Sequence, residues 1–355
     1  MIRFGPAGIP LSCKGRTLKD GVEDVHNLSL TALEIQMVRA GTQDTYPNEE
    51  DVGLTIKDLT DRLVVEIVRD DESITDPDMP IEEDDVLVQM IYGITNSFGE
   101  LYPIGNMAKR LDVAVSLHTP NYMDLGSNNE LTNTCVNSIR HAGVIVNALG
   151  GEVVVTNLGL YNGLHDEETV NANIYENVSM LMDWWKEAGL KPKLGVEITG
   201  QQDVFGSLDQ ILDICKEIKG LTPVLNFPHY HARTSGSLLE PDDFKYVIEQ
   251  VQPYCKKGGI HALFAGVEHS DGNEHRLTPI KKGDLKFDTL AECLVDLKPE
   301  MTIISSSPLL EHDAMYMRII HERYLSKKVA KAIRVKKKNA EDAALAAEAG
   351  TGAEE

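Results

Sequence analysis

The stretch VAVSLHT at residues 113–119 is followed by EVVVTNL at 152–158 and KLGVEIT at 193–199. Each is a short apolar run rich in β-branched residues, and a segment with helical periodicity separates it from the next. Five more such runs continue the alternation in both directions, at 2–5, 33–38, 222–227, 260–266 and 301–307. Strands that alternate with helices predict a parallel sheet, and eight of each predict a (β/α)8 barrel of the TIM type.

The segments between these runs have the apolar spacing of amphipathic helices. They lie at 17–31, 98–110, 128–149, 168–188, 206–218, 241–251, 287–296 and 309–325. A doubly wound open sheet would also alternate strands with helices, but it normally carries a glycine-rich phosphate turn after an early strand. The turn after the first run reads GPAGIP rather than GxGxxG, which favours the barrel. We therefore predict one barrel domain over residues 1–330.

Residues 41–95 do not fit the repeat of this barrel. They contain two further strand-like runs, 63–68 and 86–92, separated by an acidic loop rich in Asp and Pro. This pattern predicts an acidic β-hairpin inserted after the second barrel strand. It is either a regulatory or oligomerisation flap or a solvated decoration with no role in chemistry.

The C-terminal residues 331–355 are predicted to be a tail outside the barrel, first basic and then acidic. Between Lys327 and Lys338 the chain has seven basic residues and no acidic one. The sequence beyond Asn339 is of low complexity, which is typical of a disordered segment or a frayed helix.

The formal net charge of −22 argues against broad nonspecific affinity for DNA, because Lys and Arg supply most of that affinity. Residues 41–90 alone contribute −13, so the remainder is only mildly acidic and a basic face remains possible. The five cysteines are scattered and form no CxxC motif, which indicates a reducing compartment. No membrane span or secretory signal is recognisable, and we expect a cytoplasmic protein without a membrane partner.

Polar residues gather where the predicted barrel strands end, which is where an α/β barrel carries its active site. The third to sixth runs end in His118, Asn157, Glu197 and Asn226. The sixth run is followed by His229 and His231, and the seventh by Glu268, His269, Asp271, Asn273 and His275. Five of the 11 histidines thus fall at one face. Imidazoles and carboxylates that converge on one opening are typical of a zinc or manganese site.

Glu197 is the strongest single candidate, because a carboxylate at the end of an apolar strand needs a cation or hydrogen-bond donors to be tolerated. His229 and His231 are two residues apart, so an extended chain would place both on one side. We expect one of them to be a metal ligand or acid–base group and the other to support it. His261 begins its strand, and we interpret it as structural.

At these residues the chain resembles the endonuclease IV family of apurinic/apyrimidinic endonucleases, within the xylose isomerase-like barrel superfamily. The resemblance extends over nearly the whole chain. It is carried by VSLHTPNYMDLG (115–126), VEITGQQDVFGS (196–207), NFPHYHA (226–232), GNEHRLTPI (272–280) and SSSPLLEHDA (305–314). It implies a metal-dependent phosphodiesterase in which a zinc cluster activates a hydroxide that attacks DNA at an abasic site.

The resemblance implies a metal site formed by His118, Glu197, His229 and His275, with Glu197 catalytic. Five other ligand positions of the family differ here and hold Asn157, Asn226, Leu263, Asn273 and Ser306. The expected cofactor is therefore a divalent metal, with Zn²⁺ as the first candidate and fewer than three ions per chain. Supporting or substitute ligands would be Asn157, Asn226, His231, His269, Asp271 and Asn273.

Two other functions remain open. Sugar isomerases and epimerases of the same superfamily use a metal and a pair of carboxylates to move protons next to a carbonyl, with a small sugar as ligand. The second alternative is a barrel that has lost catalysis and acts as a binding or scaffold protein, which the five substituted positions suggest.

Overall fold

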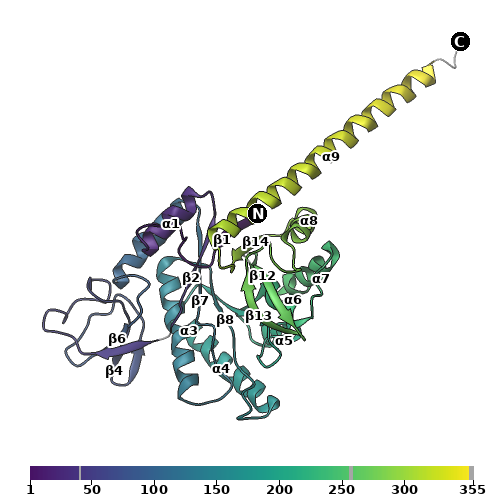
Figure 1. Cartoon of the computed structure of the whole chain (residues 1–355). Coiled ribbons are helices and arrows are strands. Elements are labelled where there is room, and N and C mark those ends of the chain that lie inside the picture. The colour runs from purple at the N-terminus through teal and green to yellow at the C-terminus, as the bar shows by residue number, and fades with distance from the viewer. Residues whose placement is uncertain (40, 256–258, 352–355) are drawn as a thin grey trace.

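A computed structural model of the chain describes residues 1–39, 41–255 and 259–351, with side chains up to residue 340. Eight parallel strands form one sheet that curls into a nearly closed barrel (Figure 1). In their order around the sheet they are β1 (Ile2–Pro6), β14 (Met301–Ser305), β11 (Ile260–Phe264), β10 (Leu221–Asn226), β9 (Lys193–Glu197), β8 (Val153–Thr156), β7 (Ala114–His118) and β2 (Ala32–Gln36). The predicted (β/α)8 barrel is confirmed.

The eight predicted helices are present and cover the outside of the barrel (Figure 1). They are α1 (Leu18–Asn27), α2 (Leu101–Arg110), α3 (Glu130–Leu149), α4 (Glu167–Glu187), α5 (Leu208–Glu217), α7 (Pro241–Val251), α8 (Phe287–Leu297) and α9 (Glu311–Thr351). Short 3-10 turns at Phe98–Glu100 and Gln252–Tyr254 adjoin α2 and α7. Among the described helices, none has an apolar stretch long enough to cross a membrane.

The two ends of the sheet meet at β1 and β2, where a glycine makes the close approach possible. A Cβ on Gly5 would lie 1.8 Å from the carbonyl oxygen of Ala32, so no larger residue fits. The Thr31 N–H donates to the Phe4 carbonyl at 3.0 Å, and Ala7 forms an isolated parallel bridge with Glu34. These few contacts close the barrel without a continuous ladder of backbone hydrogen bonds between β1 and β2.

Apolar side chains fill the middle of the barrel interior, and polar side chains lie toward its end. Ala32, Val153, Val155, Val224, Leu263 and Ile304 form a buried apolar layer between the strands. Glu34, fully buried on β2, accepts a hydrogen bond from His261 at 2.8 Å. His261 therefore pairs inside the barrel, in keeping with the structural role predicted for it.

The insertion after β2 is a four-stranded antiparallel sheet, which is larger than the predicted hairpin. Its strands lie in the order β3 (Thr42–Thr45), β6 (Val86–Met90), β4 (Val64–Arg69) and β5 (Glu72–Ile74). It lies beside the barrel, near α1 and α3 (Figure 1). Glu66 on β4 fixes it there, because its Oε2 lies 2.8 Å from His141 Nε2 on α3.

The C-terminal segment is one long helix through the described residues. α9 packs against α8 at its start and then projects away from the barrel (Figure 1). The basic residues 327–338 lie on this helix, while residues 352–355 lie outside the described part of the chain.

Two elements at the carboxyl end of the barrel were not predicted. A short helix, α6 (Phe227–Arg233), begins directly after β10, and a hairpin of β12 (Gly266–Ser270) and β13 (Asn273–Thr278) follows β11. Pro228 near the start of α6 and the Asn226 cap favour helix in a segment that we expected to be extended. Both elements position side chains at the candidate site.

Candidate functional site

The carboxyl ends of the barrel strands surround a cavity of about 320 Å³, which we call the mouth cavity. Its polar lining comes from several different strands and loops. It includes Gln36, His118, Asn121, Tyr122, Asn157, Glu197, Thr199, Gln201, Asn226, His229, Glu274 and Ser306. No residue of the 41–95 insertion and no Lys or Arg lines this cavity in the described part of the chain. The insertion therefore does not cover the site.

Glu197 and His118 form a buried ion pair at the base of the mouth cavity. Glu197 Oε2 lies 3.2 Å from His118 Nε2, and both side chains are almost completely buried. Burial would lower the pKa of His118, but the neighbouring carboxylate raises it to about 9. Burial would raise the pKa of Glu197, but the imidazolium lowers it to about 2. At neutral pH the pair is a carboxylate and an imidazolium.

Asn226 connects this pair to α6. Its Nδ2 donates to Glu197 Oε1 at 2.8 Å, while its Oδ1 accepts the His229 backbone N–H at 3.1 Å as the helix cap. An aspartate at this position could cap the helix but could not donate to Glu197. The asparagine that departs from the endonuclease IV pattern therefore has a physical role, because it holds the second oxygen of Glu197.

A second histidine–glutamate pair also lines the mouth cavity. His229 Nδ1 lies 2.9 Å from the Ile198 carbonyl, which can only accept, so Nδ1 carries a proton. The other ring nitrogen, Nε2, lies 3.2 Å from Glu274 Oε2 on β13. Glu274 Oε2 is buried and has no hydrogen-bond partner among the described residues. The two groups therefore lie at ion-pair distance without a well-aligned hydrogen bond between them.

Gly200 leaves room for this second pair. A Cβ at residue 200 would lie 2.8 Å from Glu274 Oε2 and 3.2 Å from His229 Cδ2, closer than carbon contacts allow. The Glu274 N–H donates to the Gly200 carbonyl at 2.8 Å, so the backbone of β13 is also held here. The glycine-rich loop after β9 thus positions Glu274.

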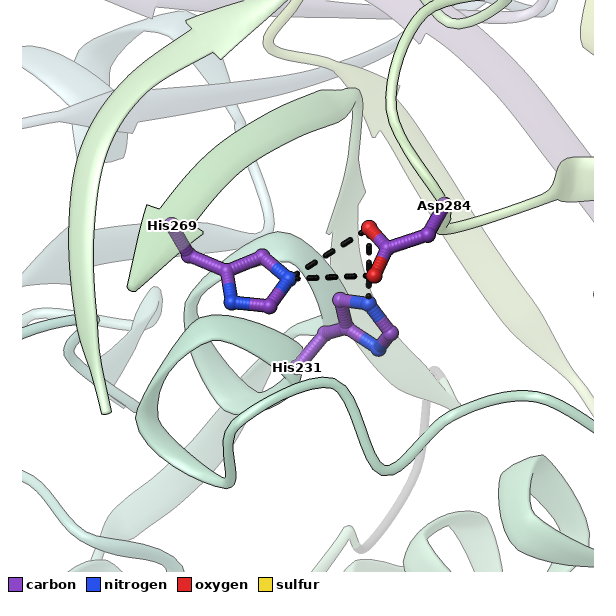
Figure 2. Close-up of side chains that lie close together, drawn as sticks. All are labelled: His231, His269 and Asp284. Carbon is purple, nitrogen blue, oxygen red and sulfur yellow. Dashed lines mark hydrogen bonds and ion pairs between the residues drawn. The ribbon is translucent and has the colours of Figure 1, made fainter. Parts of the chain in front are cut away.

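His231 does not share the face of His229, contrary to the prediction from their spacing. In α6 two residues are separated by about 200° around the helix axis, so the two rings point in opposite directions. Figure 2 shows His231 beside His269 and Asp284. His231 Nε2 and His269 Nε2 lie 3.2 Å and 3.3 Å from Asp284 oxygens. Of the described residues, these alone place three candidate ligand atoms within 4.8 Å of one another.

The hydrogen bonds of His231 do not suit a metal ligand. The Leu238 N–H donates to His231 Nδ1 at 3.1 Å, so this nitrogen holds the lone pair. Burial keeps the pKa of His231 below its usual value, and the neutral ring must then carry its proton on Nε2, which faces Asp284. A nitrogen that carries a proton cannot coordinate zinc, so in this tautomer the cluster in Figure 2 is an ion-pair contact, in which the buried His231 Nε2 has no well-aligned hydrogen-bond partner among the described residues.

The other predicted ligands hold loops or face solvent. His275 is exposed, and its Nε2 contacts Ser270 Oγ at 2.7 Å instead of reaching the mouth cavity. Asn273 Oδ1 accepts the Gln202 N–H at 2.8 Å, and Asp271 sits in the hairpin turn with a positive φ of 51°. Asn157 lines the cavity, and its Nδ2 donates to the Asn121 carbonyl at 2.7 Å.

The residues at the mouth cavity do not fit a preformed zinc site. Zinc binds its ligands at about 2.0–2.3 Å, so the ligand atoms of one ion lie within about 4.6 Å of one another. His118, Glu197 and His229 line the same cavity but do not meet this distance as a group of three in the described structure. His118 is instead protonated against Glu197. We therefore derive no chemical step through a metal.

Two residues of the site were not found from the sequence. Glu274 precedes His275, which we favoured, and only the register of the β12–β13 hairpin decides which of the two enters the cavity. Gln36 ends β2 and contacts Glu34 at 3.1 Å, but a glutamine after an apolar strand is too common to stand out.

Comparisons with known proteins agree with this architecture. The family described as xylose isomerase-like TIM barrel matches residues 100–307, which is more than half of the chain and contains most of the mouth-cavity residues. An uncharacterized protein of Methanocaldococcus jannaschii is 29% identical over 211 residues, which cover 58% of this chain and 76% of that protein.

Solved structures with the same fold belong to proteins of different activity. A D-tagatose 3-epimerase-like protein superposes with a TM-score of 0.58 at 19% identity and covers 91% of this chain and 99% of its own. Endonuclease IV from Thermus thermophilus gives 0.55 at 16% identity with the same coverage. An L-ribulose 3-epimerase gives 0.57 at 12% identity, with 94% and 98% covered. At these identities the likeness establishes the fold alone.

Proposed function

The chain belongs to the xylose isomerase-like TIM barrel family, and on this premise we propose that it isomerises or epimerises a small sugar in the mouth cavity. One observation carries the proposal: two histidine–glutamate pairs, His118–Glu197 and His229–Glu274, line one cavity of about 320 Å³. That volume is at the lower end of small-molecule sites, and the polar lining suits hydroxyl groups.

His229 is the acid–base group in this proposal. Its Nδ1 proton is held by the Ile198 carbonyl, so Nε2 is the nitrogen that takes up and returns a proton. Glu274 Oε2, 3.2 Å away, stabilises the ring when it is protonated and orients it toward the cavity. Such a pair can remove a proton from a carbon beside a carbonyl and return it to the neighbouring carbon on the same face, whereas inversion at one carbon needs a proton donor on the other face as well.

His118 supplies positive charge in the same cavity. Removal of the carbon-bound proton moves negative charge onto the carbonyl oxygen, and a buried cation stabilises that charge more than water does. The Glu197 carboxylate keeps His118 protonated, since the raised pKa of about 9 lies above neutral pH. In this reading Glu197 acts through His118 and not as the base, because its own pKa is lowered to about 2.

Incision of abasic-site DNA by an endonuclease IV-like phosphodiesterase has less support. That activity expects basic residues at the opening of the barrel, where DNA phosphates would lie. The described lining of the mouth cavity contains no Lys or Arg, and two of the four expected ligands, His118 and Glu197, are engaged with each other. Zinc would also require His275, which lies outside the cavity.

Proton exchange in deuterated water tests the proposal directly. We expect wild-type protein to incorporate deuterium next to the carbonyl of at least one aldose or ketose in a panel, read by NMR. His229→Gln should abolish exchange, because glutamine cannot take up the proton. His275→Gln is the matched control and should exchange normally, since His275 is exposed and outside the cavity.

Two results would contradict this function. Exchange that survives in His229→Gln would remove His229 as the acid–base group, and no exchange across the panel would favour the noncatalytic binding barrel. Incision of abasic DNA is assayed in parallel, together with elemental analysis of untagged protein purified without chelator. If the wild type holds two or more zinc ions per chain, and Glu197→Gln loses both the zinc and the incision of abasic DNA, the endonuclease function would be established instead.

A further inference from the structure

Two further cavities lie on the side of the barrel that faces the insertion sheet. The first, of about 450 Å³, shares the lining residue Gln36 with the mouth cavity. The second, of about 840 Å³, shares Arg16, Leu18, Gly93 and Ile94 with the first and lies between α1, α2 and β6. We call these two neighbouring cavities the side groove. Residues of both the barrel and the insertion line it.

Cations gather along the side groove although the chain as a whole carries a net charge of −22. They are Arg16, Lys19, Arg39, Arg62 and Arg110. Lys19 and Arg110 form no ion pair or side-chain hydrogen bond with the described residues, and Arg16 donates only to the Pro10 carbonyl at 2.9 Å. Arg16, Lys19 and Arg110 are exposed, so these charges are accessible to a dissolved anion.

The two carboxylates of the groove neutralise only part of this charge. Asp61 pairs with Arg62 at 3.1 Å, and Glu100 accepts the Asn96 N–H at 3.0 Å. Arg62 also pairs with Asp51, so it adds little free charge to the groove. The groove therefore has more donors and more positive charge than its own acceptors satisfy.

The backbone adds to this positive character. α1 begins at Leu18, and the first amides of a helix have no acceptor within it. Leu18 and Lys19 both line the larger cavity, so the start of this 10-residue helix lies beside the cations, with the Asp20 amide already capped by Thr17 and the Asp20 carboxylate in the first turn. Arg16, directly before the cap residue Thr17, has a positive φ of 57°, which an arginine rarely adopts.

We propose that the side groove binds a phosphate-type anion carried by the substrate, so that the substrate is a phosphorylated sugar. Guanidinium groups and helix amides match the tetrahedral oxygens of a phosphate ester, and Gln36, which lines both the smaller groove cavity and the mouth cavity, places the two side by side. The sugar part of this inference rests on the proposed function, whereas the anion site stands on the groove alone.

Binding of inorganic phosphate tests the anion site without any turnover. We expect calorimetric titration at constant ionic strength to detect binding to the wild type. Arg16→Gln and Arg110→Gln should each weaken it roughly tenfold, because each removes a charge-assisted donor. Arg334→Gln removes the same charge from the exposed part of α9, and Glu197→Gln alters the mouth cavity; both should bind phosphate as the wild type does. Circular dichroism checks that each variant is folded.

Paired substrates separate this inference from the proposed function. A sugar phosphate should exchange its proton with a lower KM than the same sugar without phosphate, and Arg16→Gln should remove that difference. If the KM for the sugar phosphate is the same in the wild type and in Arg16→Gln, the groove inference is overturned while the isomerase function stands. Phosphate binding that is absent, or unchanged in both arginine variants, would also overturn it. Phosphate binding that needs Arg16, without exchange on any sugar, would support the site and contradict the function.

Discussion

His118 Nε2 lies 3.2 Å from Glu197 Oε2 in the interior of the barrel, and Asn226 holds the other carboxylate oxygen at 2.8 Å. Two buried opposite charges are tolerated because each is hydrogen-bonded: His118 Nδ1 also donates to the Thr119 carbonyl at 2.6 Å. Removal of one partner leaves the other charge buried without compensation. The protonation of His118 is therefore a direct report on the pair.

Glu197→Gln should lower the pKa of His118 from about 9 to below its ordinary value of 6.5. Without the carboxylate, burial is the main influence on the ring, and burial disfavours the charged form. NMR of histidine-labelled protein measures this titration directly. His312→Gln changes an exposed histidine outside the pair and serves as the control, because His118 should titrate in it as in the wild type. A His118 pKa that stays near 9 in Glu197→Gln would show that another group holds the proton.

Stability should depend on pH through the same pair. Since the pKa of His118 is raised from 6.5 to about 9, its contribution is complete below 6.5 and is lost as pH rises through 9. Since the pKa of Glu197 is lowered from 4.5 to about 2, its contribution is present above 4.5 and is lost as pH falls through 2. Urea denaturation should show the free energy of unfolding falling between pH 6.5 and 9, by at most about 1.4 kcal/mol per pH unit from this pair. In Glu197→Gln this alkaline decline should be absent, and an identical slope in both proteins would contradict the assignment.

The barrel was predictable because each strand and helix has its own local pattern. The runs at 113–119 and 152–158 became β7 and β8 nearly as predicted. The insertion was recognised by its composition, but only two of its four strands have an apolar run. β3 and β5 are short and polar, and they are strands because their backbones pair with β6 and β4.

The sequence placed three of the candidate residues near one another, but it did not give the geometry of the site. His118, Glu197 and His229 line one cavity because strand ends converge by topology, which the sequence pattern implies. The choice of Glu274 over His275 depends on the register of one hairpin, and the opposite directions of His229 and His231 depend on a two-turn helix. Neither follows from residue types and spacing, because a short segment between elements carries too few residues for a periodicity.

Gly200→Ala should separate His229 from Glu274 while the barrel stays folded. The added Cβ would lie 2.8 Å from Glu274 Oε2, so that side chain must move. We expect a stability loss of about 1–3 kcal/mol, typical of overpacking, and a much larger fractional loss of proton exchange. Gly41→Ala is the control, since its Cβ would meet only ordinary contacts at 3.5 Å. Full exchange activity in Gly200→Ala would argue against a role for the His229–Glu274 contact.

Glu66→Gln should loosen the insertion sheet from the barrel. Glu66 is 5% exposed and pairs with His141 at 2.8 Å, and Arg140 reaches its other oxygen at 3.5 Å. Loss of a buried charge-assisted contact costs about 1–3 kcal/mol, and limited proteolysis should then cut within residues 41–95 sooner. Glu72→Gln, on the exposed strand β5, should leave both measurements unchanged. Equal cleavage rates for the two variants would mean that other contacts fix the insertion.

His231→Phe should destabilise the protein although His231 is remote from the reacting groups. Its ring is fully buried and accepts the Leu238 N–H at 3.1 Å, and phenylalanine leaves that amide unpaired at a cost of about 1–3 kcal/mol. His275→Phe, at an exposed position of the neighbouring hairpin, should change stability by no more than about 0.5 kcal/mol. Because His231 Nε2 carries its proton toward Asp284, added zinc should not raise the melting temperature of the wild type through this cluster. A zinc-dependent rise that disappears in His231→Phe would show that the ring changes its tautomer and binds the metal, with the Leu238 amide released.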